Sequence, residues 1–273
     1  MNWKRSERLV DMTNYLLNNP RKIIPLTYFV DKYGAAKSSI SEDISIIKET
    51  FNQQGIGILK TLAGASGGVI YSVNVRSEDI QSSIHTLCEW IEKPDRILPG
   101  GYLYMADIIG NPHLMDEVGK ILASKYIDKD IDVVMTVATK GITLAYATAR
   151  YLNVPVVIVR RDSKITEGST VSINYVSGST KKIQSMVLAR KSLKEGSKVL
   201  IVDDFMKAGG TVNGMISLLE EFRAELAGIA VLIEADYNER LINEYTSIIK
   251  LTHVDEKEKK IVVSEGNILC KEV

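Results

Sequence analysis

Two adjacent carboxylates and a pair of glycines stand close together in the second half of the chain. Asp203 and Asp204 follow the apolar run 199–202, and Gly209 and Gly210 come shortly afterwards, just before a helical pattern. Main-chain N–H groups at a helix start bind anions, and glycine lets the backbone approach them closely. Carboxylates repel phosphate, but they accept hydrogen bonds from hydroxyl groups or hold a cation. The stretch therefore predicts a site for a phosphate beside a diol, as in a ribose 5-phosphate.

A second loop has the same position between a strand and a helix. It consists of Ala138, Thr139, Lys140 and Gly141. The apolar run 131–137 precedes it and a helical pattern over 142–152 follows, so it too favours an anion, and Lys140 adds a positive charge. Arg160 and Arg161 end the next apolar run and could reach the same polyanion.

The elements that must position these loops alternate in type. We expect strands over 102–109, 131–137, 154–159, 171–175, 199–202, 226–233, 247–251 and 260–263, and helices over 113–127, 142–152, 211–222 and 237–245. This alternation predicts an α/β fold with a doubly wound parallel sheet, in which ligands bind at the carboxyl ends of the strands. Tyr102 could stack on such a ligand or simply pack. The polar segments 162–170 and 177–182 fit either a lid over the site or a charged surface hairpin.

The first quarter of the chain has a different pattern. Helices are expected over 6–19, with Ser6 as a possible cap, over 25–33, and from 38, where Ser39 and Glu42 fit a capping box. The third helix carries an apolar stripe of Ile40, Ile44, Ile47 and Phe51. The β-prone runs 57–62 and 69–73 then form a hairpin. Three helices followed by a hairpin predict a winged helix-turn-helix domain.

A winged helix places its third helix in the DNA major groove. The candidate DNA-binding residues are Lys4, Arg5, Arg8, Lys37, Ser38, Ser39, Ser41 and Lys60. Residues 1–74 contain nine Lys or Arg against six Asp or Glu, which is a weak basic excess. The serines could instead cap the helix. The whole head could instead bind another protein.

Composition sets the remaining bounds. The 273 residues predict two domains, which we place at 1–74 and 95–273, joined by a linker helix within 75–94. The linker's apolar stripe could pack on the body or on a twin subunit. Cys88 and Cys270 are isolated, which favours a reducing cytoplasm, and the chain has no apolar run long enough for a membrane span.

The acid–glycine stretch resembles the phosphoribosyl pyrophosphate (PRPP) motif of the type I phosphoribosyltransferases. That resemblance implies that Asp203 and Asp204 take the ribose hydroxyls and that Ala208, Gly209, Gly210 and Thr211 cradle the 5-phosphate. The loop 138–141 would hold the pyrophosphate, and Phe205, Met206, Arg160 and Tyr102 complete the expected effector site. The chain has Lys207 and Ala208 where many of these enzymes have a small residue and a threonine, which puts turnover in doubt.

The whole chain resembles the purine operon repressors of Gram-positive bacteria with low genomic G+C content. The matching stretches are 4–8, 36–43, 98–102, 138–142, 166–178 and 202–210. The resemblance implies a homodimeric repressor that binds operator DNA and is released by PRPP, with no catalytic residue and no metal site of its own. Mg²⁺ could accompany PRPP, and purine nucleotides could compete with it.

Two alternatives remain open at this point. The chain could be an active purine phosphoribosyltransferase with an accessory nucleic-acid-binding head, or its head could bind RNA. The coupling also has two possible routes. PRPP could change the angle between head and body through the helix 77–92, or DNA phosphates could compete for the basic loops.

Overall fold

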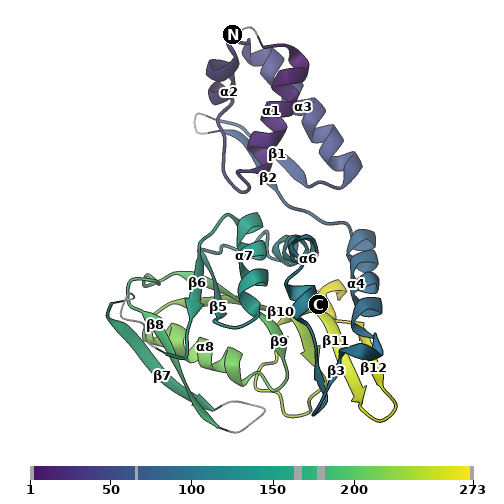
Figure 1. Ribbon diagram of the computed structural model, residues 1–273. Coiled ribbons are helices and arrows are strands. Elements are labelled where there is room, and N and C mark those ends of the chain that lie inside the picture. Colours follow the sequence, from purple (N-terminus) through teal and green to yellow (C-terminus); the bar gives the residue numbers. More distant parts are fainter. Residues whose placement is uncertain (1–2, 65–66, 163–167, 177–181, 271–273) are drawn as a thin grey trace. The chain divides into compact units, whose positions relative to one another are not determined.

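The computed structural model describes residues 3–64, 67–162, 168–176 and 182–270 (Figure 1). The chain divides into two compact units, which we call the head and the body. The head is Met1–Arg76 with Arg150–Asn153, and the body is Ser77–Ala149 with Val154–Val273.

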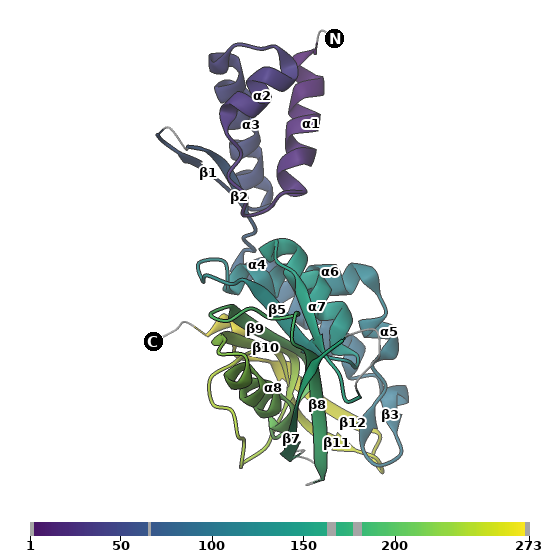
Figure 2. The same ribbon diagram turned by 90° about the vertical axis from the view of Figure 1, so that its left-hand side faces the viewer.

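The head has the element order of a winged helix, as predicted. Its elements are α1 (Arg5–Leu17), α2 (Leu26–Tyr33), α3 (Lys37–Gln54), β1 (Ile58–Leu62) and β2 (Gly68–Ser72). The two strands pair antiparallel, and Figure 2 shows their hairpin beside α3. Met12, Phe29, Ile44 and Phe51 are buried together, so one face of each helix forms a common core. Residues 65 and 66 of the predicted hairpin tip lie outside the described residues.

Both predicted helix caps of the head are wrong. The first helix begins at Arg5, so Ser6 lies inside its first turn. The carboxylate of Glu7 instead accepts a hydrogen bond from the Lys4 N–H at 2.8 Å. The third helix begins at Lys37 behind the extended Ala36 and has no side-chain cap, so Ser39 and Glu42 form no capping box. The hydroxyl groups expected to cap α3 are therefore not used for that purpose.

The head ends in a residue that is bonded to the third helix. After β2, Arg76 donates hydrogen bonds to the carbonyls of Asn52 and Gln53 in the last turn of α3, both at 2.6 Å. The next residue, Ser77, begins helix α4 (Ser77–Ile91).

Helix α4 packs on the body, which is one of the two surfaces the sequence left open for it. Its stripe of Ile80, Ile84, Leu87 and Ile91 is buried, and the helix contacts β11, β12 and α6. The Val263 N–H also bonds to a Glu92 carboxylate oxygen just beyond the helix, at 3.3 Å.

The body is built on a six-stranded sheet in the order β12-β11-β10-β9-β5-β6. The strands are β5 (Val133–Val137), β6 (Val156–Val159), β9 (Lys198–Met206), β10 (Glu225–Ala235), β11 (Thr246–Asp255) and β12 (Lys260–Glu265). All neighbours pair parallel except β11 and β12. Figure 1 shows α8 (Gly210–Glu221) on one face, and α6 (Pro112–Lys125) and α7 (Gly141–Leu152) on the other. The doubly wound α/β fold is therefore confirmed.

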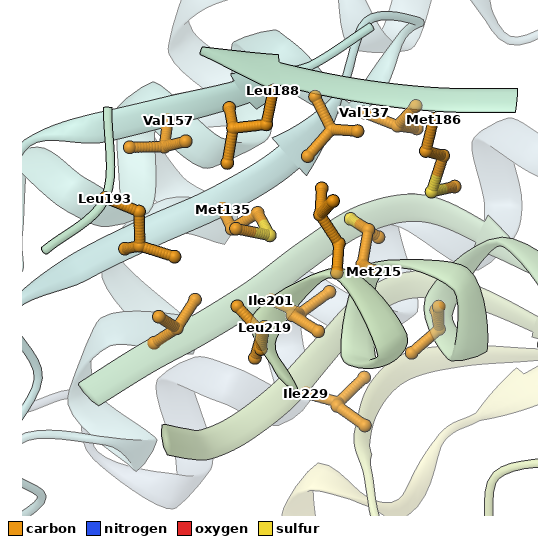
Figure 3. Packing of buried hydrophobic residues seen from close by; sticks show 14 of the residues in the cluster. Met135, Val137, Val157, Met186, Leu188, Leu193, Ile201, Met215, Leu219 and Ile229 are labelled. Atoms are coloured by element: carbon orange, nitrogen blue, oxygen red, sulfur yellow. The ribbon is translucent and has the colours of Figure 1, made fainter. Parts of the chain in front are cut away.

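A hairpin covers the α8 side of the sheet. It is formed by β7 (Thr170–Val176) and β8 (Ile183–Ala189), of which β8 was not predicted. Met186 and Leu188 of β8 pack with Met135, Ile201 and Met215 in one buried cluster (Figure 3). Parts of the polar segments for which a lid or a surface hairpin was expected, 163–167 and 177–181, lie outside the described residues.

Two predicted elements of the body are wrong. The run 102–109 divides into β4 (Tyr102–Leu103), which pairs with β3 (Ile97–Leu98), and the short helix α5 (Ala106–Ile109). An apolar run of this length does not distinguish a strand from a buried helical turn. The segment 237–245 is a loop, because the Leu241 N–H bonds to the distant Ala208 carbonyl at 3.0 Å. No helix in the described part of the chain is long and apolar enough to cross a membrane.

Candidate effector site

A cleft of about 710 Å³ opens at the carboxyl ends of the parallel strands. Its predicted lining residues are Tyr102, Lys140, Asp203, Asp204, Phe205, Met206, Lys207, Ala208, Gly209, Gly210 and Thr211. Strand β9 runs on to Met206, so the two acids lie on the last part of the strand. The sequence had suggested that they follow the strand. The pairing of β9 with β10, in which Asp203 lies opposite Val231 and Phe205 opposite Ile233, holds the main chain of both acids in place.

The two acids differ in exposure and in how far their surroundings raise the pKa. Asp203 is buried, with 4% of its surface exposed, and its Oδ1 accepts a hydrogen bond from the Asp204 N–H at 3.0 Å. Burial, and then the neighbouring charge of Asp204, raise the pKa of Asp203 well above its ordinary value. Burial also raises the pKa of Asp204, but its hydrogen bonds, with Asp203 first, and then the charge of Lys140 oppose that rise. Asp204 is therefore the carboxylate suited to meet a ligand, and Asp203 supports it.

The glycine loop presents free N–H groups to the cleft. Among the described residues, the N–H groups of Ala208 and Gly209 have no hydrogen-bond acceptor. Gly209 has φ +80°, a left-handed conformation that suits glycine, and α8 begins directly after it. Unpaired N–H groups at a helix start form an anion site. Lys207 also lines the cleft and adds a positive charge beside this loop; its ammonium lies 6.0 Å from the Tyr237 ring centroid.

The second predicted loop is only partly available to a ligand. Lys140 lines the cleft, but the N–H groups of Ala138 and Thr139 already bond to the carbonyls of Val159 and Val137, each at 2.7 Å. A Cβ on Gly141 would lie 2.9 Å from Asp203 Oδ1, so this glycine lets the start of α7 touch the acid pair. The main-chain N–H groups of Ala138 and Thr139 are therefore not free to hold a pyrophosphate.

Arg160 lies beside the β7–β8 hairpin. Its main-chain N–H and carbonyl pair with Val187 at 2.9 and 2.7 Å, and it is not among the residues that line the cleft. Its proposed contact with a polyanion stays a prediction.

The other wall of the cleft was missed by the sequence analysis. It comes from the β3–β4 turn and from the ends of β10 and β11, and it includes Gly100, Gly101, Leu103, Met105, Ala235, Asp236, Leu251, Thr252, His253 and Val254. The rule that ligands bind at the carboxyl ends of parallel strands could have located 235–236 and 251–254. Among the described residues, no cluster of three or more His, Cys, Asp or Glu side chains could hold a metal.

The candidate DNA-binding residues of the head fall into two groups. Lys37, Ser38 and Ser41 are exposed at the start of α3, and Lys60 is exposed on β1, while Ser39 is half-buried. Lys4 is exposed immediately before α1. Arg5 and Arg8 have a structural partner, because the Nε of each bonds to a different oxygen of Asp43 at 2.9 Å.

Replacing Arg8 by alanine is expected to destabilise the head by about 2–4 kcal/mol. Asp43 is fully buried and the Arg8 side chain is 13% exposed, so the substitution leaves a buried carboxylate short of a partner. Arg5→Ala is the matched control: its side chain is 52% exposed, and we expect a loss of about 1 kcal/mol or less. Urea unfolding followed by Trp3 fluorescence in a Trp90→Phe background measures both. Equal losses would contradict the structural role of Arg8.

The winged-helix head and the acid–glycine cleft together define a DNA-binding regulator whose body has the phosphoribosyltransferase fold. Residues 4–73 match the family described as bacterial purine repressor, N-terminal, and residues 105–266 match the phosphoribosyl transferase domain family. The chain belongs to the family of bacterial purine biosynthesis transcriptional regulators.

Curated transcriptional regulators and a curated phosphoribosyltransferase are similar to this chain. The purine biosynthesis transcriptional repressor PurR of Bacillus subtilis is 59% identical, over 98% of this chain and 95% of its own length. The purine biosynthesis transcriptional activator PurR of Lactococcus lactis subsp. lactis is 47% identical, over 97% of this chain and 98% of its own length. A xanthine phosphoribosyltransferase of Lactococcus lactis subsp. cremoris is 34% identical, over 54% of this chain and 75% of its own length.

Proposed function

We propose that this chain is a cytoplasmic repressor of purine genes that binds operator DNA as a dimer and is released when PRPP enters the cleft. The observation that carries the proposal is that Asp204 and the free N–H groups of Ala208 and Gly209 belong to one cleft, in a chain that also has a winged-helix head. A carboxylate that meets a diol beside an anion cradle matches ribose 5-phosphate. Purine nucleotides share these groups and would compete with PRPP.

The proposed site binds its ligand without turnover. Lys207 and Ala208 replace the small residue and the threonine of many related enzymes, and Lys207 strengthens anion binding instead. Mg²⁺ would accompany PRPP, because this ion is usually held by one or two carboxylates together with ligand phosphates. Asp204 and the pyrophosphate supply that donor set.

Release of DNA by PRPP requires that binding at the cleft and binding at the head are thermodynamically linked. If PRPP binds the free form tenfold more tightly than the DNA-bound form, DNA affinity falls tenfold, which is about 1.4 kcal/mol. Competition between PRPP and DNA phosphates for basic loops is one route, and a change of angle between head and body is the other. Log affinity for DNA falls linearly with log salt, in proportion to the phosphates contacted. An unchanged slope in the presence of PRPP would count against competition.

The decisive experiment titrates PRPP into the protein bound to duplex DNA from upstream of a purine operon, at fixed salt. We expect release of the DNA at micromolar to millimolar PRPP without formation of pyrophosphate. A single-stranded RNA of the same sequence serves as the control for RNA binding. Because one relative is named an activator, transcription of the downstream gene is measured in parallel, and stimulation by the DNA-bound protein would contradict repression.

An active purine phosphoribosyltransferase is the second candidate. It is favoured by the similarity to the xanthine phosphoribosyltransferase. The same samples test it, because release of pyrophosphate on addition of xanthine, guanine or hypoxanthine would make the body an enzyme.

A further inference from the structure

We propose that Arg240 is a positioning residue for the phosphate cradle. It lies outside the cleft, in the loop 236–245, and it fixes the direction in which the cradle N–H groups point. This inference rests on the proposed function, because it concerns the affinity of the same site for its phosphate ligand.

Three successive carbonyls of the cradle are held by donors. The Nε of Arg240 donates to the Lys207 carbonyl at 3.2 Å, and the Leu241 N–H donates to the Ala208 carbonyl at 3.0 Å. The Asn213 N–H in the first turn of α8 donates to the Gly209 carbonyl at 2.8 Å. The cradle carbonyls are therefore all occupied on the side away from a bound anion.

Peptide geometry converts held carbonyls into directed N–H groups. In a planar trans peptide the carbonyl and the N–H of the next residue point in opposite directions. Holding the carbonyls of residues 207, 208 and 209 thus turns the N–H groups of Ala208, Gly209 and Gly210 the other way. These three residues line the cleft, so their N–H groups converge on the place expected for the phosphate.

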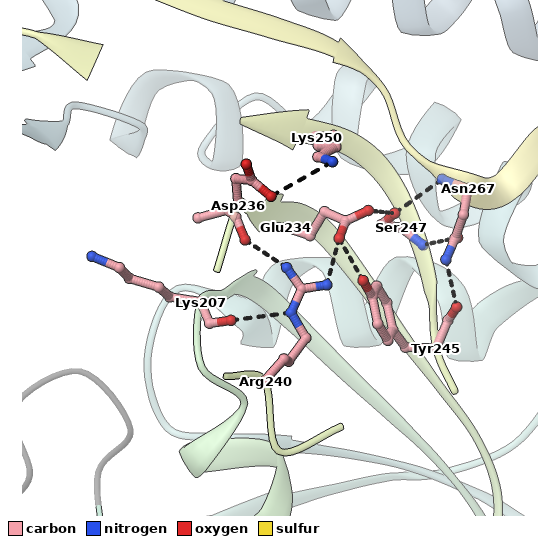
Figure 4. A network of polar contacts seen from close by, with 9 residues as sticks. Lys207, Glu234, Asp236, Arg240, Tyr245, Ser247, Lys250 and Asn267 are labelled. Atoms are coloured by element: carbon pink, nitrogen blue, oxygen red, sulfur yellow. Dashed lines mark hydrogen bonds and ion pairs between the residues drawn. The ribbon is translucent and has the colours of Figure 1, made fainter. Parts of the chain in front are cut away.

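Arg240 is itself held rigidly (Figure 4). Its Nη1 bonds to Glu234 Oε2 at 2.6 Å and its Nη2 to the Ala235 carbonyl at 2.5 Å. The guanidinium carbon lies 4.9 Å from the Tyr245 ring centroid. Glu234 is held in turn by the hydroxyl groups of Tyr245 and Ser247, at 2.5 and 2.7 Å. The Lys207 carbonyl is therefore fixed by a donor that has little freedom to move.

Loss of Arg240 would release one peptide of the cradle. The Lys207–Ala208 peptide would then be free to rotate, and rotation brings a carbonyl dipole toward the phosphate in place of an N–H. The Leu241 and Asn213 N–H groups would still hold the next two peptides. We therefore expect weakened binding of the phosphate, not its abolition.

The test compares three variants of the full-length protein. Arg240→Ala combined with Glu234→Gln removes the guanidinium without leaving Glu234, whose side chain is 8% exposed, as an unpaired charge. Glu234→Gln alone is expected to keep Arg240 on the Lys207 carbonyl, because the amide oxygen still accepts from Arg240 and the bond to the Ala235 carbonyl remains. Asn243→Ala is the matched control, because Asn243 is an exposed residue of the same loop and lines the same neighbouring cleft as Arg240.

Two readouts are taken on each variant. Calorimetry measures the affinity for PRPP, and amide NMR follows the N–H signals of Ala208, Gly209 and Gly210 as inorganic phosphate is added. We expect the double variant to bind PRPP about tenfold more weakly, the size of one hydrogen bond to a charged group. Its Ala208 amide should no longer respond to phosphate, and both single variants should behave like the wild type. Wild-type affinity and amide responses in the double variant would overturn the proposal.

The outcomes separate this inference from the proposed function. If phosphate shifts the wild-type amides and the double variant loses the Ala208 response, but PRPP releases no DNA, the proposed function fails and the role of Arg240 stands. If PRPP releases DNA from the wild type and the double variant at the same concentration, the role of Arg240 fails and the proposed function stands. If neither phosphate nor PRPP affects the wild type, both fail.

Discussion

Replacing Asp204 by alanine is expected to weaken PRPP binding by about 10- to 150-fold and to leave operator affinity unchanged. A hydrogen bond to a charged group contributes about 1.5–3 kcal/mol, which corresponds to that range. Asp204 lines the cleft in the body, while the head carries the candidate DNA contacts. Calorimetry with PRPP and fluorescence anisotropy with operator DNA measure the two affinities. Loss of DNA binding in this variant would mean that Asp204 is structural.

Asp203→Asn is the matched control for that substitution. The amide keeps the shape of the buried carboxyl and an oxygen for the Asp204 N–H, so PRPP binding should stay within about threefold, less than one ordinary hydrogen bond contributes. A loss as large as that of Asp204→Ala would show that Asp203 binds the ligand as a charged group.

The same variant predicts the pH dependence of stability. The raised pKa of Asp203 means that its contribution to stability is fully present below its ordinary pKa of 3.8 and is lost as the pH rises through the raised value. The wild type therefore loses stability relative to Asp203→Asn as the pH rises above 3.8. Melting temperatures measured from pH 3 to pH 8 should show Asp203→Asn gaining stability relative to the wild type as the pH rises above 3.8, until the raised pKa is passed. A difference that stays constant over this whole range would contradict the raised pKa.

Gly209→Ala is expected to weaken PRPP binding at least about tenfold and to destabilise the body by about 1–3 kcal/mol. Two effects combine at this position. The left-handed φ of +80° is costly for alanine, and the new Cβ would lie 2.9 Å from Ile242 Cγ1. Relief of that contact must move either the cradle or the loop 236–245 that holds it. Calorimetry with PRPP and thermal unfolding measure the two losses.

Gly196 provides a control with the same backbone strain and no contact. Its φ is +75°, and a Cβ there would meet no atom within 4 Å. Gly196→Ala should therefore lower stability by about 1 kcal/mol and leave PRPP affinity unchanged. If both alanine variants bind PRPP as tightly as the wild type, the cradle does not depend on the conformation of Gly209.

The sequence predicted those parts of the fold that depend on local pattern. The stripe of α3 and the strand–acid–glycine–helix order around Asp203 and Gly209 are encoded by neighbouring residues, so periodicity and residue type located them. The head and the parallel sheet followed from the order of such segments.

The missed parts depend on contacts between distant residues. The segment 237–245 has helix-forming residues, but its Leu241 N–H is held by the Ala208 carbonyl and its Arg240 side chain by Glu234, which no local pattern reveals. The ion pairs of Arg5 and Arg8 with Asp43 likewise join positions far apart in the sequence. In the far wall of the cleft, Thr252 and His253 could have been located by the rule for the carboxyl ends of parallel strands, whereas Gly100 and Gly101 of the β3–β4 turn could not.

The hydrogen bonds between Arg76 and the end of α3 make the connection between head and body very short. Arg76 is tied to the carbonyls of Asn52 and Gln53, and the next residue already belongs to α4, which is packed on the body sheet. One residue spans at most about 3.6 Å of extended chain. If two copies of the chain assemble through their bodies, the distance between their two α4 helices would therefore limit how far apart the two heads can lie. The spacing of half-sites in the proposed operator would then depend on the assembly of the bodies as well as on the winged helix.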